Sequence, residues 1–187
     1  MTVKIKTYIE DDMASIVNRV STALTAKLKQ IDPKIEGVWY EFGTKLEIIE
    51  TLSQKSQGNV YKFKKYPLVC LFTDIPHSVG NNTNDTAELR LNMAIIYGTK
   101  ATFKAKDRLE KNFKPIIMPI YHEFLRQISL DGKVFLNASA IVNIRHTTQR
   151  KYYWGTQPIG GENAFNDFVD GLEIDNLELK HYLTRCI

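Results

Sequence analysis

The stretch Tyr66–Pro76, YPLVCLFTDIP, decides the fold of this chain. Its middle, Leu68–Phe72, is a continuous apolar run, and a proline closes it on each side. The run is too short for a core helix, and its length and proline boundaries favour a strand that is buried on both faces. The sequence therefore predicts a sheet with this strand at its centre. Cys70 lies inside the run and is expected to be a packed thiol.

The size and composition of the chain indicate one globular domain. It has 187 residues, of which 43% are hydrophobic and 25% charged, so a single domain over residues 1–187 is predicted. The formal net charge of +4 is too small to argue for nucleic-acid binding by itself. Two cysteines are too few for a disulfide framework. No secretory signal and no apolar window of membrane length is recognisable, so we expect no membrane contact and assembly in a cytosol.

Helical periodicity predicts two principal helices. The first covers Glu10–Ile31, where apolar residues recur at steps of three and four behind an acidic start. The second covers Asp107–Ile128 and contains two prolines, so a kink or break is predicted near Pro115. Thr44 and Glu47 have the spacing of a capping box and predict the start of a shorter helix.

Alternating apolar residues predict the remaining strands. They lie at residues 35–42, 87–99, 134–144 and 172–179. Asp175–Asn176 interrupts the alternation of the last one, which is typical of a bulge. Residues 1–9 also alternate, and we expect an edge strand or an arm that pairs with a neighbour. The predicted fold class is α+β, a mainly antiparallel sheet with the two principal helices packed on it.

Two predicted loops and one basic segment carry the candidate contact residues. Residues 77–86 are polar and predict a surface loop, and residues 145–166 form a connection long enough to be functional. Residues 100–106 are predicted to be a basic hairpin tip, and Asp170–Gly171 a turn. The candidate DNA-channel or interface residues are Lys100, Lys104, Lys106, Arg108, Arg145, Arg150 and Lys151, and the candidate interface aromatics are Tyr152, Tyr153 and Trp154. Basic residues beside aromatic ones can hold phosphates, and Tyr, Trp and Arg also anchor protein interfaces. A solvated helix end and an aromatic loop packed on its own domain would explain the same pattern.

The residue types of an active site are present without the spacing that catalysis needs. The four histidines are scattered, with no cysteine or acid at metal-ligand spacing. Asp74 with Glu88 and Arg90 resembles a metal-dependent nuclease pattern, but arginine replaces the lysine and cannot act as a base. No nucleophile elbow and no phosphate-binding loop is found, so no enzyme and no cofactor is predicted.

Four stretches of the sequence resemble a known family. They are Leu46–Ile49 (LEII), Lys65–Pro76 (KYPLVCLFTDIP), Arg150–Gly155 (RKYYWG) and Asn166–Ile174 (NDFVDGLEI). The amino-acid sequence of these stretches and the order of the predicted elements resemble those of the tail-terminator and head-tail joining proteins of tailed bacteriophages. The similarity is to the type found in phages and prophages of Bacteroidetes. The resemblance covers most of residues 44–179.

The resemblance implies a virion structural protein without catalysis. Members of that family form homo-oligomeric rings at the head-tail junction or at the tail end, beside portal, connector or tail-tube proteins and around double-stranded DNA. It implies assembly in the bacterial cytoplasm and a final location in the virion, and no site residue is carried over. Two alternatives stay open: a nucleic-acid-binding module that uses residues 100–114 and 145–154, and a metal-dependent nuclease that uses Asp74 and Glu88.

Overall fold

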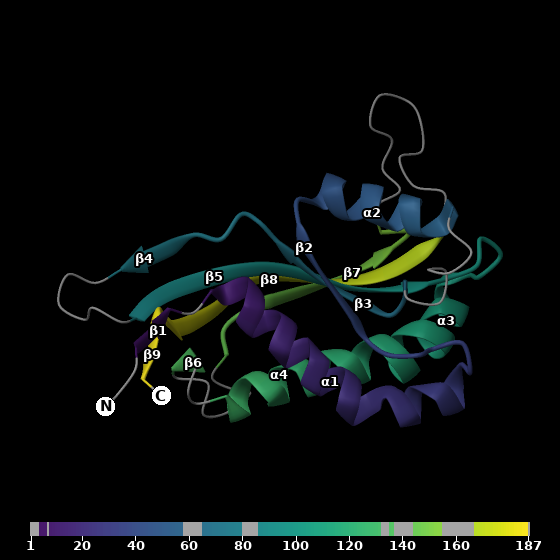
Figure 1. Ribbon diagram of the computed structural model, residues 1–187. Helices are drawn as coiled ribbons and strands as arrows, with labels where there is room; N and C mark the ends of the chain where they lie inside the picture. The colour runs from purple at the N-terminus through teal and green to yellow at the C-terminus, as the bar shows by residue number, and fades with distance from the viewer. Residues whose placement is uncertain are drawn as a thin grey trace.

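A sheet of seven strands with helices on both faces forms the body of the protein (Figure 1). The computed structural model describes residues 4–6, 8–57, 65–79, 86–131, 135–136, 144–154 and 167–186. The helices in this part of the chain are α1 (Ile9–Ile31), α2 (Lys45–Gln57), α3 (Ala105–Arg108), the π-helix η2 (Leu109–Ile117) and α4 (Met118–Leu130). The strands of the sheet are β2 (Trp39–Gly43), β3 (Leu68–Phe72), β4 (His77–Val79), β5 (Thr86–Gly98), β6 (Phe135–Leu136), β7 (Thr147–Tyr152) and β8 (Val169–Tyr182).

The two longest strands, β5 and β8, make the centre of the sheet. They pair antiparallel along their whole length, and the strand order is β2-β3-β5-β8-β6, with β4 also on β5 and β7 also on β8. β3 is buried on both faces, as predicted, but it lies between β2 and β5, so its predicted central position is wrong. Only the β2–β3 pair among these strands is parallel. The fold class is α+β with a mixed, mainly antiparallel sheet, which confirms the prediction.

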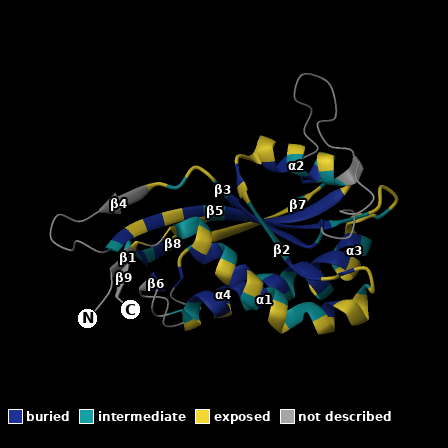
Figure 2. Ribbon diagram, viewed as in Figure 1, coloured by how far each residue is buried: buried dark blue, intermediate teal, exposed yellow. Residues whose placement is uncertain are grey.

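The larger core lies between the sheet and the helices α1, η2 and α4, which cover one face (Figure 2). The alternation predicted for β5 places Leu89, Leu91 and Met93 on this face, and all three are buried. Phe113 of η2 and Phe124 of α4 pack into the same core and are fully buried. Removing such side chains from water is the main favourable term in folding, so this layer fixes the helices on the sheet.

A smaller core lies on the opposite face, under α2. It includes Ile48, Cys70 and Trp154. Cys70 is a free thiol that is fully buried, as predicted, and burial raises its pKa above the ordinary value.

The α2 helix begins with the predicted capping box. The Thr44 N–H donates to Glu47 Oε2 at 2.7 Å, and the Glu47 N–H donates to Thr44 Oγ1 at 3.2 Å.

Beyond α2 no helix of the described residues covers this second face of the sheet (Figures 1 and 2), and charged side chains project from it. Glu88 and Arg90 project from β5 opposite Lys180 and Glu178 of β8. Lys180 Nζ lies 3.2 Å from Glu88 Oε1, and Arg90 Nε lies 3.5 Å from Glu178 Oε1. The sheet is therefore covered on both faces at one end and on one face at the other.

The predicted bulge in β8 is present and has a defined cause. The register between β5 and β8 shifts between Leu91 and Met93, so Asp175 and Asn176 together oppose Asn92. Asn176 takes a left-handed conformation with φ 54°, and its N–H donates to Asn92 Oδ1 at 3.0 Å. Asparagine tolerates this conformation better than most residues.

The two prolines lie in one continuous helix, so the predicted break near Pro115 is absent, and a π-helical distortion occupies that position. α3, η2 and α4 follow one another without interruption from Ala105 to Leu130, and Pro115 lies inside the π-helical part. At the junction with α4 the Met118 N–H donates to the Phe113 carbonyl five residues back, the bond of a π-helix. The wider turn accommodates the ring of the proline, which has no N–H to donate.

No helix of the described residues is long and apolar enough to cross a bilayer.

Several predicted loops contain strands. The predicted loop 77–86 begins as β4 and ends as the start of β5, and residues 80–85 lie outside the described residues. Strand β7 occupies residues 147–152 of the predicted loop 145–166, of which residues 155–166 lie outside the described residues. Asp170–Gly171 lies within β8 and is not a turn. Of the predicted strand 134–144, the structure describes β6 and Ile144.

The ends of the chain pair with each other. β1 (Lys4–Lys6) and β9 (Thr184–Cys186) form a separate antiparallel ribbon, with Lys4 opposite Cys186. The predicted arm therefore includes an edge strand whose partner in this structure is the same chain's β9. Both ends lie at the left of Figure 1, away from α3.

Candidate functional site

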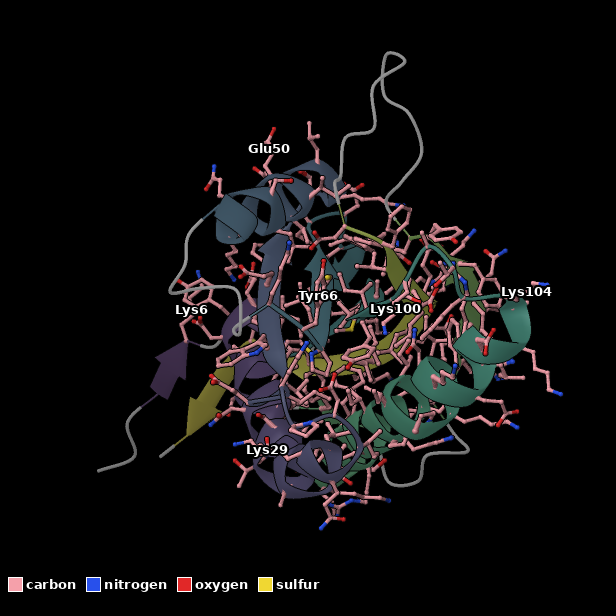
Figure 3. The ribbon with its side chains drawn as sticks, turned by 90° about the vertical axis from the view of Figure 1, so that its right-hand side faces the viewer. Lys6, Lys29, Glu50, Tyr66, Lys100 and Lys104 are labelled. Atoms are coloured by element: carbon pink, nitrogen blue, oxygen red, sulfur yellow. The ribbon has the colours of Figure 1, made fainter. Side chains whose placement is uncertain are left out.

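Most of the basic and aromatic candidates gather at one end of the sheet, where β5 ends, β8 begins and β7 passes beside β8. Figure 3 views the protein from the side of this end. The segment 99–104 leads from β5 to α3 and joins the neighbouring elements through backbone bonds. The Thr99 N–H donates to the Phe168 carbonyl at 2.7 Å, and the Tyr153 hydroxyl donates to the Ala101 carbonyl at 3.0 Å. We call this region the basic end.

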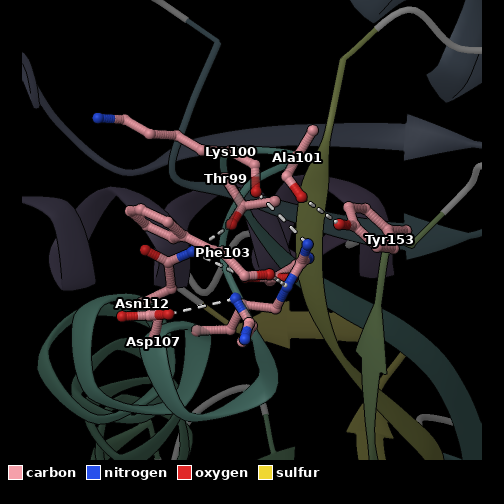
Figure 4. A network of polar contacts seen from close by, with 10 residues as sticks. Thr99, Lys100, Ala101, Phe103, Asp107, Asn112 and Tyr153 are labelled. Carbon is pink, nitrogen blue, oxygen red and sulfur yellow. Dashed lines mark hydrogen bonds and ion pairs between the residues drawn. The ribbon is translucent and has the colours of Figure 1, made fainter.

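A buried charged network lies under the basic end (Figure 4). Arg108 of α3 is 2% exposed, and its Nη1 donates to Oδ1 of the fully buried Asp170 at 2.7 Å. Asn112 of η2 donates from Nδ2 to the other carboxylate oxygen, also at 2.7 Å. Both oxygens of a buried carboxylate thus accept a hydrogen bond, which such a charge requires in the interior.

The same network fixes the path of segment 99–104. Arg108 Nε donates to the Phe103 carbonyl at 2.9 Å, and its guanidinium carbon lies 3.6 Å from the centre of the Tyr153 ring. Asn112 also donates to Thr99 Oγ1 at 2.9 Å. A planar guanidinium can bond in its plane and stack on an aromatic face at once, so Arg108 ties the segment to β7 and β8.

Two of the predicted contact residues are therefore structural. Arg108 and Trp154 are each 2% exposed, so the prediction that they contact DNA or a partner at the surface is wrong. Trp154 packs against Gly171, and its Nε1 donates to Glu173 Oε1 at 3.0 Å. Lys45 lies over its ring with Nζ 5.0 Å from the centre. The sequence offers no local signal for these contacts, because the partners are distant in the chain.

Three lysines form the outer layer of the basic end. Lys100, Lys104 and Lys106 are exposed and make no ion pair with any residue that the structure describes. In Figure 4 the Lys100 side chain points away from the Arg108 network. The nearby Asp107 is already engaged: its pKa is lowered by the hydrogen bond from the Lys111 ammonium and by the backbone N–H of Lys104. The predicted hairpin tip 100–106 is in fact a turn and the first residues of α3.

Phe103 lies beneath two ammonium groups. Lys111 Nζ is 4.5 Å and Lys100 Nζ is 5.6 Å from the centre of its ring. Cation–π attraction holds an ammonium group over the face of an aromatic ring. Lysines of the same chain therefore lie over the Phe103 ring.

The candidates on β7 divide between its two faces. Tyr152 and Arg150 lie on the helix side, next to Phe113. The ring centres of Tyr152 and Phe113 are 5.4 Å apart, and the guanidinium carbon of Arg150 lies 5.8 Å from the centre of the Phe113 ring. Lys151 lies on the α2 side, 3.6 Å from Glu173 Oε2. Arg145 is exposed before the other end of β7, where its carbonyl accepts from the Glu178 N–H at 2.9 Å. Arg145 lies seven positions before Tyr152, about 23 Å at the strand rise, so it does not join the basic end.

The histidine and nuclease candidates occupy other places. His122 is exposed, and His181 is buried with Nε2 2.8 Å from Asp12 Oδ2. Asp74 is exposed, while Glu88 and Arg90 each pair with a residue of β8. Within the described ranges, no three residues of the His, Cys, Asp and Glu types come together as metal ligands would.

Comparison with known proteins identifies no family for this chain. No protein-family model matches it. A search of the curated proteins gives no significant match.

Proposed function

We propose that this chain is a structural protein of a tailed-bacteriophage virion, which forms a homo-oligomeric ring as a tail terminator or head-tail connector. The observation that carries the proposal is that the sheet has two unlike edges, β2 with β4 on one side and β7 with β6 on the other. A contact between two different surfaces of the same chain is heterologous, and repetition of such a contact around an axis closes a ring. The order of elements, which resembles that of the tail-terminator family, supports the same conclusion.

Both edges carry exposed groups suited to a protein contact. Phe42 of β2 is 41% exposed and Tyr152 of β7 is 42% exposed. Among the described residues β2 pairs with β3 alone, and β7 with β8 alone. An edge strand offers unpaired backbone N–H and carbonyl groups to another strand. Aromatic side chains are enriched at protein interfaces.

The proposal assigns no catalysis to the chain. Its partners are further copies of itself, portal, connector or tail-tube proteins above and below the ring, and double-stranded DNA within it. Assembly takes place in the cytoplasm of the bacterial host, and the virion is the final location.

Light scattering with negative-stain microscopy tests the proposal. The wild-type chain should form closed rings, alone or with tail-tube or connector protein. The variant Phe42→Asp should stay monomeric, because a charge would replace the exposed ring on one edge. The matched control Leu130→Asp changes a side chain that is 65% exposed at the end of α4 and should leave the rings intact. A wild-type chain that remains monomeric with those partners present would refute the proposal.

A further inference from the structure

We infer that Lys100, Lys104 and Lys106, here called the lysine surface, hold the sugar-phosphate backbone of double-stranded DNA without reading its sequence. This inference rests on the proposed ring, since it names the part of each subunit that meets the DNA. Three observations support it: the net charge of the basic end, the hydrogen bonds that fix its backbone, and the contacts that cover its aromatic rings.

The outer layer of the basic end keeps a net positive charge. Arg108 is neutralised in the interior by Asp170. Lys111 pairs with Asp107 at 3.1 Å, and Lys114 pairs with Glu110 at 2.6 Å. Asp107 also attracts Lys104, so part of the charge of Lys104 is balanced as well. Lys100 and Lys106 form no ion pair with a described residue, and they leave the lysine surface net cationic. Surface lysines of this kind replace the counterions that a duplex carries on its phosphates.

The lysine surface is also presented from a fixed backbone. The Phe103 N–H donates to the Lys100 carbonyl at 3.0 Å, which closes a turn and brings Lys100 near Lys104. Arg108 and Tyr153 hold the same segment through the Phe103 and Ala101 carbonyls. Only the flexible lysine stems are left to adjust, so binding orders little of the chain.

The aromatic rings indicate that the ligand is duplex backbone and not a single strand. Single-strand binding proteins stack bases on open aromatic faces. At the basic end the Phe103 ring lies under two ammonium groups, the Tyr153 ring lies under the Arg108 guanidinium, and Trp154 is buried. The Phe103, Tyr153 and Trp154 rings are therefore covered, and Tyr152, which is 42% exposed, packs edge-on against Phe113 at 5.4 Å between ring centres. Lysine contacts to phosphate position a protein on DNA without specifying bases.

The test measures binding of a short mixed-sequence DNA duplex to the assembled full chain by fluorescence anisotropy over a salt series. The three phosphate contacts of one subunit predict a fall in affinity on the order of 40-fold between about 50 and 200 mM salt, and contacts from further subunits of the ring would steepen it. The triple variant K100Q/K104Q/K106Q should lose most of this salt dependence, at about one unit of the log–log slope for each lysine. The control K27Q/K29Q changes two exposed lysines of α1, of which Lys29 lies away from Lys104 in Figure 3. It should bind as the wild type does.

The outcomes separate this inference from the ring itself. Rings of the triple variant that bind the duplex as tightly as the wild type would overturn the lysine surface and leave the proposed function standing. An equal loss in the α1 control would also overturn it, because net charge alone would then explain binding. Tighter binding of a single strand of the same sequence would overturn the assignment to duplex. A failure of the wild type to form rings refutes the proposed function instead.

Discussion

Arg108 Nη1 and Asp170 Oδ1 lie 2.7 Å apart, joined across 62 residues of sequence and almost completely shielded from solvent. The pair connects the first turn of the long proline-containing helix to the start of β8. Removal of one partner of such a pair leaves the other charge buried and uncompensated. We therefore expect Arg108→Met to lower the free energy of unfolding by about 3–5 kcal/mol, measured by urea denaturation.

The control for this prediction is Lys114→Met, which breaks the exposed pair with Glu110. An exposed pair of this spacing contributes only about 0.3–0.5 kcal/mol, so the control should unfold nearly as the wild type does. The double variant Arg108→Met with Asp170→Leu should recover part of the loss, because it leaves no unpaired charge. Equal stability of Arg108→Met and the control would show that the ion pair does not stabilise the fold.

Gly171 is a position where any side chain should disturb the smaller core. A Cβ there would lie 3.0 Å from three side-chain atoms of Trp154. Gly171→Ala should therefore displace the indole and cost about 1–3 kcal/mol, as overpacking usually does. Near-UV circular dichroism should report the altered indole environment, and urea denaturation the lost stability.

Gly98→Ala is the matched control for Gly171→Ala. Its Cβ would lie 3.5 Å from the nearest atom of Tyr66, which is ordinary van der Waals contact. We expect little change in the near-UV spectrum and a stability change within about 1 kcal/mol. Identical behaviour of the two variants would contradict the close packing of Trp154 on Gly171.

The bulge in β8 depends on the left-handed backbone of Asn176. Asn176→Val should cost about 1–2 kcal/mol, because a β-branched residue is strained at φ 54°. Asn176→Gly should be tolerated, since glycine adopts this conformation freely. Thermal unfolding of both variants distinguishes backbone strain from the loss of the side chain. Destabilisation by glycine as large as that by valine would refute this explanation.

The capping box of α2 predicts a pH effect on one carboxyl group. Hydrogen bonds from Thr44, first from its backbone N–H and then from its side chain, lower the pKa of Glu47 below the ordinary value. A group whose pKa is lower in the folded state stabilises the fold above its unfolded pKa, and this contribution is lost as pH falls through the folded value. NMR titration should show the low pKa of Glu47 in the wild type. Thr44→Ala should move this pKa upward only in part, because alanine keeps the backbone N–H that is the larger cause. An unchanged Glu47 pKa in that variant would contradict the contribution of the Thr44 side chain.

Regular periodicity explains which parts of this fold could be predicted from sequence. The helix α1 and the strand β5 follow from apolar residues at helical and alternating spacing, and the bulge follows from one interruption of that spacing. These signals are local, and tertiary packing agrees with them.

The pairing of distant residues explains what the sequence could not reveal. Asp170–Gly171 has the composition of a turn, yet the ion pair to Arg108 and the packing of Trp154 hold it inside a strand. Nothing near Arg108 in the chain distinguishes it from the exposed lysines around it. The sequence therefore could not separate the buried arginine of the basic segment from its outer lysines.

The uneven cover of the sheet has a consequence for the shape of a subunit. Where α2 lies on the sheet, the protein has three layers, and beyond α2 it has two (Figure 1). A body that is thicker at one end than at the other is a wedge. In the proposed ring, neighbours meet through the edges of the sheet, at right angles to this thickness. The layer that α2 adds would therefore make one rim of the ring thicker than the other.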